Sequence, residues 1–279
     1  MDKSVDKSVD KSVEKSVRPE PLVIIDKELS GVPGAVRITL NRADTFNSLS
    51  ESLIDALQNS LDEVAASDAR VVVLAGAGRA FCAGHDLKEM RATPSFEYYQ
   101  ALFARCSQMM LTIQRMPQPV IARVHGVATA AGCQLVAMCD LAVAASTARF
   151  AVSGVNLGLF CSTPSVPLSR NLSRKAAFEM LVTGDFIDAQ TACERGLVNR
   201  VATPERLDDA IRELVTSISE KPRAAIAAGK SLFYRQLEAG IDTAYQLAGE
   251  TMARNMLDDA ALEGIEAFIQ KRTPRWRET

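Results

Sequence analysis

The sequence is poor in the residues that metal sites and nucleic-acid interfaces usually require. Its 279 residues include two histidines and one tryptophan, and 32 Lys plus Arg against 34 Asp plus Glu give a formal net charge of −2. Two histidines exclude a polyhistidine metal site, and no C-x-x-C pair suggests zinc, so we predict no bound metal. The balanced charge gives no indication of a nucleic-acid or membrane partner.

The sequence also gives no indication of a disulfide framework or of a membrane-spanning segment. The uncharged stretch from 124 to 139 is shorter than the roughly 20 residues that cross a bilayer, and the N-terminus MDKSVDKSV lacks the apolar core of a secretory signal. We therefore predict a cytoplasmic protein with free thiols in its core. The cysteines are Cys82, Cys106, Cys133, Cys139, Cys161 and Cys193, and most of them lie in apolar stretches.

Three parts of the chain differ in composition. Residues 2–17 repeat DKSV three times and EKSV once, which places like charges four residues apart and opposes a helix, so we expect a disordered tail over 1–19. Strand and helix patterns alternate over 20–204, which predicts an α/β core. The part from 205 to 279 is almost entirely helical in pattern and predicts a separate C-terminal layer.

The core pattern repeats a strand, a glycine-rich loop and a helix. We expect a helix opened by a capping box of Ser48 and Glu51, a further helix over about 97–115, and helices from Arg174 onward. Apolar or alternating runs predict strands at 22–26, 34–40, 71–76, 120–126, 141–146 and 196–201. The sequences GAGRAFCAGHD and VATAAGCQ follow two of these strands as loops.

Two such loops favour chemistry at backbone amides. A dinucleotide site is excluded because Phe81 stands where the motif needs its third glycine, and a phosphate-binding loop is excluded because no Gly-Lys-Ser/Thr follows. Each loop could supply one N–H to a single oxygen and so form an oxyanion hole. Tight packing of strand against helix explains the same small residues equally well.

The motifs as a set resemble the crotonase superfamily of enoyl-CoA hydratases and isomerases, over roughly residues 20–276. The matching stretches are GAGRAFCAGHDLKEM, HGVATAAGCQLVAMCDLAVA, FAVSGVNLGL, LVTGDFIDAQTACERGLVNRV and FIQKRTPRW. The runs TAAGCQLVAMCD and GVNLGLFCSTPSV are most similar to the branch called enoyl-CoA hydratase domain-containing protein 3. The resemblance implies a spiral of ββα units, a helical layer that forms trimers or hexamers, and an acyl-CoA thioester as substrate with no other cofactor.

The resemblance also assigns roles to residues. It implies that the amides of His85 and Ala131 bind the thioester oxygen, although the family usually has glycine where Ala131 stands. Further residues are expected to bind the CoA part of the substrate: Arg79, Ala83 and Lys88 near the first loop, and Phe268, Lys271 and Arg272 near the C-terminus. The cations Arg79, Lys88, Lys271 and Arg272 could equally be solvated surface residues.

The acid and base of a hydratase are missing. The hydratases of the family use two glutamates, and this sequence has Gln134 and Gly154 at their positions. Glutamine cannot exchange a proton near neutral pH and glycine has no side chain. Asp86 and Asp140 do not replace the glutamates, because hydratases carry acids there as well, and we expect them to cap and bond loop amides.

Other groups near the expected acyl site leave the function open. His85 could act as a general acid or base or contribute its amide alone, Cys161 could be a nucleophile but is expected to be a buried thiol, and His125 is expected to satisfy backbone groups. The sequence thus predicts an acyl-CoA-binding member of the family with weak or no hydratase activity. Two alternatives remain: a non-catalytic binder or scaffold, and an active hydratase or isomerase with an unrecognised base.

Overall fold

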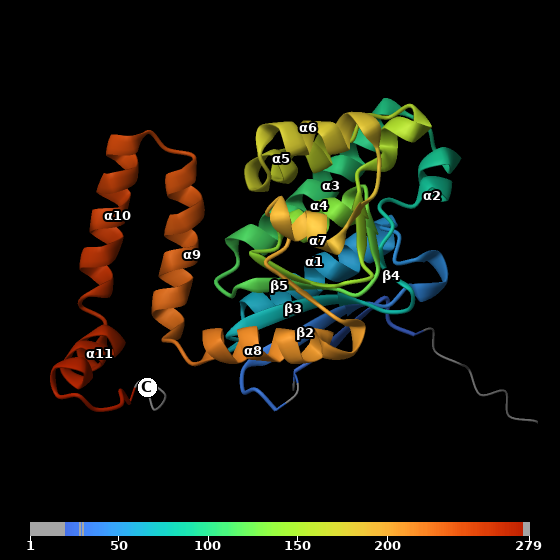
Figure 1. Cartoon of the computed structure of the whole chain (residues 1–279). Coiled ribbons are helices and arrows are strands. Elements are labelled where there is room, and N and C mark those ends of the chain that lie inside the picture. The colour runs from blue at the N-terminus through green and yellow to red at the C-terminus, as the bar shows by residue number, and fades with distance from the viewer. Residues whose placement is uncertain (1–19, 28, 30, 276–279) are drawn as a thin grey trace, which may run out of the picture.

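The computed structural model describes residues 20–27, 29 and 31–275, so the tail predicted over 1–19 lies outside the described residues. Figure 1 shows a core of sheets and helices from which the C-terminal helices project to one side. The strands are β1 (Val23–Asp26), β2 (Ala35–Leu40), β3 (Val71–Gly76), β4 (Ala80–Cys82), β5 (Val120–Val124), β6 (Val127–Thr129), β7 (Leu141–Ala145), β8 (Arg149–Ala151), β9 (Ile187–Asp188) and β10 (Arg200–Ala202).

The helices fall into a set that covers the sheets and a set that extends beyond them. The first set is α1 (Glu51–Ala65), α2 (Leu87–Ala92), α3 (Phe96–Arg115), α4 (Ala131–Met138), α5 (Ser162–Asn171), α6 (Arg174–Thr183), α7 (Ala189–Glu194) and α8 (Leu207–Ser219). The second set is α9 (Arg223–Leu237), α10 (Ile241–Asn255) and α11 (Asp259–Ile269).

The described strands form two sheets. The larger has the order β1-β2-β3-β5-β7-β10 and is parallel except for β1, and the smaller has the order β4-β6-β8-β9 and is parallel except for β9. The chain alternates between them, since β3, β5 and β7 lie in the larger sheet and β4, β6 and β8 follow each of them in the smaller one. This is the predicted spiral of ββα units.

Both faces of the larger sheet are covered, which explains why the central strands β3 and β7 are apolar at every position. In β3, Val72 and Leu74 pack with α1, α3 and α4, whereas Val71 and Val73 face the opposite side and pack with α8. The α8 side chains in this second cluster include Leu207, Ile211 and Val215. The apolar stripe of α8 is therefore buried within the chain and does not by itself call for a second copy.

A buried ion pair attaches α9 to the core. The Nζ of Lys230 donates to the Oδ2 of Asp140 at 2.7 Å and to the carbonyls of Ile113 and Gln118 at 2.8 Å each. Asp140 also accepts the N–H of Val120 at 2.6 Å. Burial raises the pKa of Asp140 and lowers that of Lys230, because desolvation disfavours both charges. Asp140 thus bonds a backbone amide, as predicted, and in addition fixes the C-terminal layer.

Two local predictions are wrong. The cap of α1 is Ser50, whose hydroxyl accepts the N–H of Leu53 at 3.2 Å, whereas Ser48 accepts a hydrogen bond from Arg42. The glycine-rich stretches are also not loops throughout, because each contains a short strand of the smaller sheet, β4 in the first and β6 in the second. The cysteines do lie free: all are buried except Cys193, which is half-buried.

Candidate functional site

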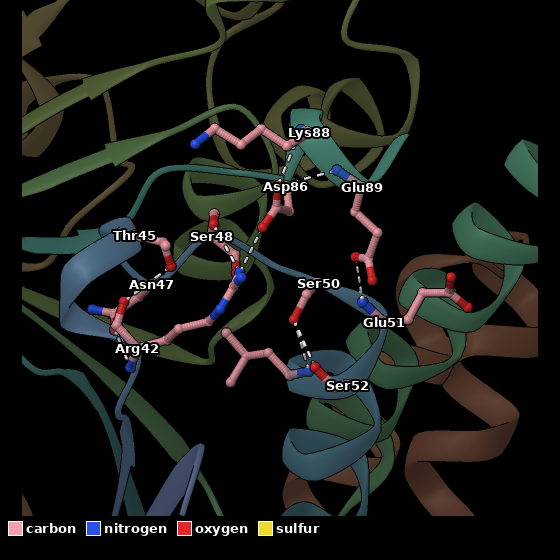
Figure 2. A network of polar contacts seen from close by, with 11 residues as sticks. Arg42, Thr45, Asn47, Ser48, Ser50, Glu51, Ser52, Asp86, Lys88 and Glu89 are labelled. Carbon is pink, nitrogen blue, oxygen red and sulfur yellow. Dashed lines mark hydrogen bonds and ion pairs between the residues drawn. The ribbon is translucent and has the colours of Figure 1, made fainter. Parts of the chain in front are cut away.

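The first loop is held in place by the segment before α1 (Figure 2). Arg42 donates to the Oδ2 of Asp86 at 2.8 Å, and the oxygen Oδ1 of Asp86 caps α2 by accepting the N–H of Lys88 and of Glu89. Burial alone would raise the pKa of Asp86, but these donors and the charge of Arg42 bring it below its usual value. The predicted capping role of Asp86 is confirmed.

Backbone hydrogen bonds fix the residues on either side of His85. The N–H of Leu49 donates to the carbonyl of Gly84 at 2.7 Å, and the N–H of Asp86 donates to the carbonyl of Leu49 at 3.1 Å. The buried Asn47 also holds the first loop, because its side-chain Nδ2 donates to the carbonyls of Ala77, Ala80 and Phe81. The direction of the His85 amide is therefore set by the backbone and not by its side chain.

The second loop lies directly against the first. A Cβ atom on Gly84 would lie 2.9 Å from the Cβ of Ala130 and 3.4 Å from the backbone nitrogen of Ala131. Gly84 has φ of +92°, which glycine adopts at no cost. Ala130 has φ 51° and ψ −120°, a conformation that is strained for a residue with a Cβ. Backbone strain of this kind concentrates at functional sites, and here it directs the peptide that carries the Ala131 amide.

The two amides at this junction are unused within the described chain. The N–H of Ala131 is at the first position of α4, where a helix offers no internal acceptor, and no described residue accepts it. The N–H of His85 likewise finds no acceptor among the described residues. The structure therefore brings together the two donors that the sequence predicted for an oxyanion hole.

A third segment closes the site beside the start of α4. Ser153 lies 3.0 Å from Thr129 between their hydroxyl oxygens, and the carbonyl of Ala151 accepts the N–H of Ala130 at 2.9 Å. These contacts place Gly154 close to the start of α4. Its N–H donates to the Sγ of Cys161 at 3.3 Å, and burial raises the pKa of that thiol. A thiol with a raised pKa is a poor nucleophile, which favours the predicted structural role of Cys161.

Gln134 stands on α4, three residues after Ala131, and is 4% exposed. Residues three apart on a helix share a face, so Gln134 lies on the same face of α4 as Ala131. Its Oε1 is buried and has no hydrogen-bond partner among the described residues. No carboxylate replaces the missing acid at this position.

The His85 ring borders an aromatic face of α3. It meets Phe103 edge-on at 5.4 Å between ring centroids, and Phe103 stacks on Tyr99 at 6.5 Å. Burial lowers the pKa of His85, and the nearby Leu49 backbone offsets this only in part. Both ring nitrogens are buried without a partner among the described residues. These aromatic residues of α3 were not predicted to lie at the site, although Tyr99 and Phe103 are four residues apart on one helix face.

The residues expected to bind CoA divide into two groups. Ala83, Arg79 and Lys88 lie in or beside the first loop; Ala83 donates its N–H to the carbonyl of Phe46 at 3.0 Å, and the Arg79 guanidinium lies 5.3 Å from the Phe46 ring centroid. The exposed side chains of Arg79 and Lys88 are free to meet phosphates at this edge.

The C-terminal group is not part of this site within one chain. Phe268 lies on α11 with Lys271 and Arg272 directly after it, and α11 lies beyond the pair of α9 and α10, on the side of the molecule away from α2 (Figure 1). Arg272 is also engaged, since it pairs with both carboxylate oxygens of Glu263 at 2.6 and 2.9 Å. This guanidinium lowers the pKa of Glu263 to about 2. Within one chain, the three residues thus lie apart from the loops of His85 and Ala131, and their binding of CoA stays a prediction.

The remaining polar candidates already have partners. His125 donates its Nε2–H to the carbonyl of Gly78 at 2.9 Å, which confirms its predicted structural role. Asn156 donates to the carbonyl of Gly184, and the hydroxyl of Ser162 donates to the carbonyl of Phe160. Buried atoms without a partner among the described residues remain on Gln134 (Oε1), His85 (both ring nitrogens) and His125 (Nδ1).

Comparison with known proteins identifies the class. The sequence profile of the enoyl-CoA hydratase/isomerase family matches residues 32–279, and the chain belongs to this family. A crystal structure titled enoyl-CoA hydratase, from Mycobacterium smegmatis, is 62% identical with a TM-score of 0.90, and the match covers 92% of this chain and 100% of that one.

Within the family, the chain is similar to the branch indicated by the sequence motifs. The rat enoyl-CoA hydratase domain-containing protein 3, named as mitochondrial, is 42% identical over 92% of this chain and 85% of its own length. The crystal structure of the human protein of the same name is 40% identical with a TM-score of 0.87, covering 91% of this chain and all of that one. Both resemblances stated from the sequence, to the family and to this branch, are confirmed.

Proposed function

We propose that this protein binds an acyl-CoA thioester with its carbonyl oxygen between the amides of His85 and Ala131. The observation that carries the proposal is the pair of amides without acceptors at the contact of two loops. Such preorganised donors stabilise negative charge that develops on a carbonyl oxygen. Arg79 and Lys88 supply positive charge for the CoA phosphates at the same edge, and coenzyme A is part of the substrate, so no resident cofactor or metal is required.

We further propose that hydration is weak or absent. Water addition needs one group to take a proton from water and another to protonate the α-carbon, and Gln134 and Gly154 provide neither. The chemistry left to the oxyanion hole is that of a thioester enolate, as in decarboxylation or isomerisation. If no thioester is converted, the protein is an acyl-CoA binder or scaffold, the alternative from another class.

Space, and not backbone conformation, limits restoration of the second acid. A Cβ on Gly154 would lie 2.6 Å from the carbonyl oxygen of Leu159 and 2.7 Å from the Sγ of Cys161. Gly154→Glu should therefore destabilise the chain. Gln134→Glu changes no volume, and it should raise crotonyl-CoA hydration, although a single carboxylate replaces only one of two groups each worth about 10² to 10⁴ in rate. Efficient hydration by the unmodified protein would refute the proposal that the acid is missing.

Calorimetry with butyryl-CoA, CoA and butyrate tests the binding mode. We expect butyryl-CoA to bind more tightly than CoA and butyrate not to bind, because only the thioester offers both phosphates and the carbonyl. Equal affinity for butyryl-CoA and butyrate would contradict the proposal. Incubation with a panel of acyl-CoA thioesters, followed by mass spectrometry, then separates turnover from binding alone.

We also propose that the protein assembles as a homotrimer, or as a hexamer of two trimers. The support is the apolar surface left open on α9–α11, where Phe268 is 84% exposed. The exposed apolar residues of these helices include Phe233, Leu237, Ile241, Tyr245, Met252, Leu257, Phe268 and Ile269. A neighbouring copy would cover them, and Phe268 with Lys271 could then reach that copy's CoA. A monomer in sedimentation at micromolar concentration would refute the assembly.

The last part of the proposal concerns the location of the protein. None of the helices in the described part of the chain has the length and apolar character needed to cross a bilayer. The cytoplasmic location stays a prediction, and the mitochondrial naming of the rat relative describes that protein.

A further inference from the structure

The N–H of His85 belongs to a peptide unit that is already bonded at its other end. The carbonyl of this unit is that of Gly84, and it accepts the N–H of Leu49 at 2.7 Å. Leu49 and His85 also pair as an isolated parallel bridge. A trans peptide is planar, and its C=O and N–H point in opposite directions. The bond from Leu49 therefore turns the N–H of His85 away from the segment that carries Leu49.

The peptide unit that donates to Gly84 is bonded in the same way. Its N–H is that of Leu49 and its carbonyl is that of Ser48, which accepts a hydrogen bond from the Nη1 of Arg42 at 3.0 Å (Figure 2). Two peptide units thus lie in series between the guanidinium of Arg42 and the N–H of His85. Each unit accepts at its oxygen and donates from its nitrogen, and the last donor finds no acceptor among the described residues.

Arg42 is held firmly at the start of this series. Its side chain is 26% exposed, and its Nη1 also lies 2.8 Å from the Oδ2 of Asp86, whose side chain is 12% exposed. The backbone of Arg42 bonds Asn47 twice, because its N–H donates to the Oδ1 at 2.9 Å and its carbonyl accepts the N–H at 2.9 Å. An arginine stays charged at any ordinary pH, and Asp86 offsets that charge where it is half-buried.

A charged donor at the start of a hydrogen-bond series strengthens the donor at its end. Hydrogen bonds from a guanidinium are stronger than those between neutral groups, and each bond of a series strengthens the next by roughly 10–30%. The N–H of His85 is then more polarised than an isolated amide. Such a donor gains most against a carbonyl oxygen on which negative charge develops. Arg42 therefore affects a hydrogen bond that it does not itself make.

We propose that Arg42 is a positioning residue of the oxyanion hole, which orients and polarises the N–H of His85 through the two peptide units Ser48–Leu49 and Gly84–His85. This inference rests on the proposed binding of an acyl-CoA thioester. It assigns a specific effect on the thioester carbonyl to a side chain that is two peptide units removed from it.

Infrared difference spectroscopy measures this effect, because the stretching frequency of a thioester carbonyl falls as the carbonyl is polarised. Butyryl-CoA with an isotope label at the carbonyl would be bound to the unmodified protein and to Arg42→Met. We expect the frequency to fall on binding to the unmodified protein and to fall less in Arg42→Met. Calorimetry should show that the ratio of the Kd for CoA to the Kd for butyryl-CoA drops by roughly 2- to 12-fold, which corresponds to one hydrogen bond.

Two further variants serve as controls. Arg42→Lys keeps a charged donor and should restore part of the carbonyl shift. Arg195→Met removes a guanidinium of similar exposure, 28%, which pairs with Glu179 at 2.8 Å and follows α7 outside the two loops. This variant should leave the carbonyl shift and the Kd ratio as in the unmodified protein.

The outcomes separate this inference from the proposed function. If folded Arg42→Met keeps both the carbonyl shift and the Kd ratio, the inference is overturned while thioester binding stands. Equal losses in Arg42→Lys and Arg42→Met also overturn it, because the charge then has no effect. If the unmodified protein shows neither a carbonyl shift nor a preference for butyryl-CoA over CoA, the proposed function fails as well. Should Arg42→Met not fold, Arg42→Gln with its neutral amide takes its place, and the same outcomes decide.

Discussion

Gly84 offers a direct test of the oxyanion hole, because its substitution acts on the contact between the two loops. In Gly84→Ala the new methyl group would meet the Cβ of Ala130 at 2.9 Å and the carbonyl oxygen of Thr129 at 3.2 Å. Ordinary contacts of this kind are about 3.5–4.0 Å, so the loops must move apart by roughly half an ångström or more. The amides of His85 and Ala131 then no longer converge on one oxygen.

Backbone strain adds to this effect and needs its own control. Alanine at a φ of +92° costs about 1–2 kcal/mol wherever it occurs. Gly31 has a φ of +76°, and no atom of the described residues lies within 4 Å of its would-be Cβ, so Gly31→Ala carries the strain without the collision. We expect Gly31→Ala to lower the free energy of unfolding by about 1–2 kcal/mol and Gly84→Ala to lower it further.

The informative measurement is the ratio of the Kd for CoA to the Kd for butyryl-CoA, because CoA lacks the thioester carbonyl. A ground-state hydrogen bond contributes about 0.5–1.5 kcal/mol, so Gly84→Ala should reduce the ratio by roughly 2- to 12-fold for each amide that is displaced. Any turnover should fall by about 10² or more, as when one donor of an oxyanion hole is removed. An unchanged ratio in folded Gly84→Ala, as measured by calorimetry and urea unfolding, would refute the role of the two amides.

Two further predictions concern stability. Burial lowers the pKa of both His85 and His125. Below about pH 6.5 the unfolded chain therefore binds more protons than the folded chain. The free energy of unfolding should consequently decrease as the pH falls from 7 to 5. Each histidine contributes up to about 1.4 kcal/mol per pH unit, and urea unfolding of His85→Asn should show a shallower slope; an unchanged slope would contradict the burial argument. Lys230→Met leaves Asp140 buried without its cation and should cost about 3–5 kcal/mol, whereas Lys27→Met, at the exposed pair with Glu63, should cost less than about 1 kcal/mol by the same assay. Equal losses would show that the buried pair is not essential.

The sequence predicted the larger sheet better than the smaller one for a physical reason. Strands such as β3 and β7 are almost entirely buried and read as continuous apolar runs. The strands β4, β6 and β8 have three residues each, which is too short for an alternating pattern, and they lie among glycines and alanines that favour loops. Their pairing is a tertiary property of the spiral.

The site, like the sheets, was predicted only in part from the sequence. Family motifs were sufficient to predict that the loops of His85 and Ala131 lie together, with no acid at Gln134 or Gly154, whereas the binding of a thioester oxygen by the two amides stays a proposal. The positive φ of Ala130 could not be predicted, because alanine by itself disfavours that conformation and only the surrounding contacts impose it. The unpaired atoms of His85 and Gln134 were equally hidden, since pairing depends on neighbours from other segments. The outward direction of α11 depends on the turns that follow α9 and α10.

The donors of the proposed oxyanion hole are main-chain groups, and this would have an evolutionary consequence. Mutation at His85 or Ala131 exchanges the side chain and leaves the N–H in place, so these positions can change the fit to new acyl groups without losing the hole. The residues that selection must hold constant are instead the supports, such as Gly84, Asn47 and the pair of Arg42 and Asp86. A lineage with this fold can therefore exchange or discard its acids and bases and still begin each new reaction from an activated thioester.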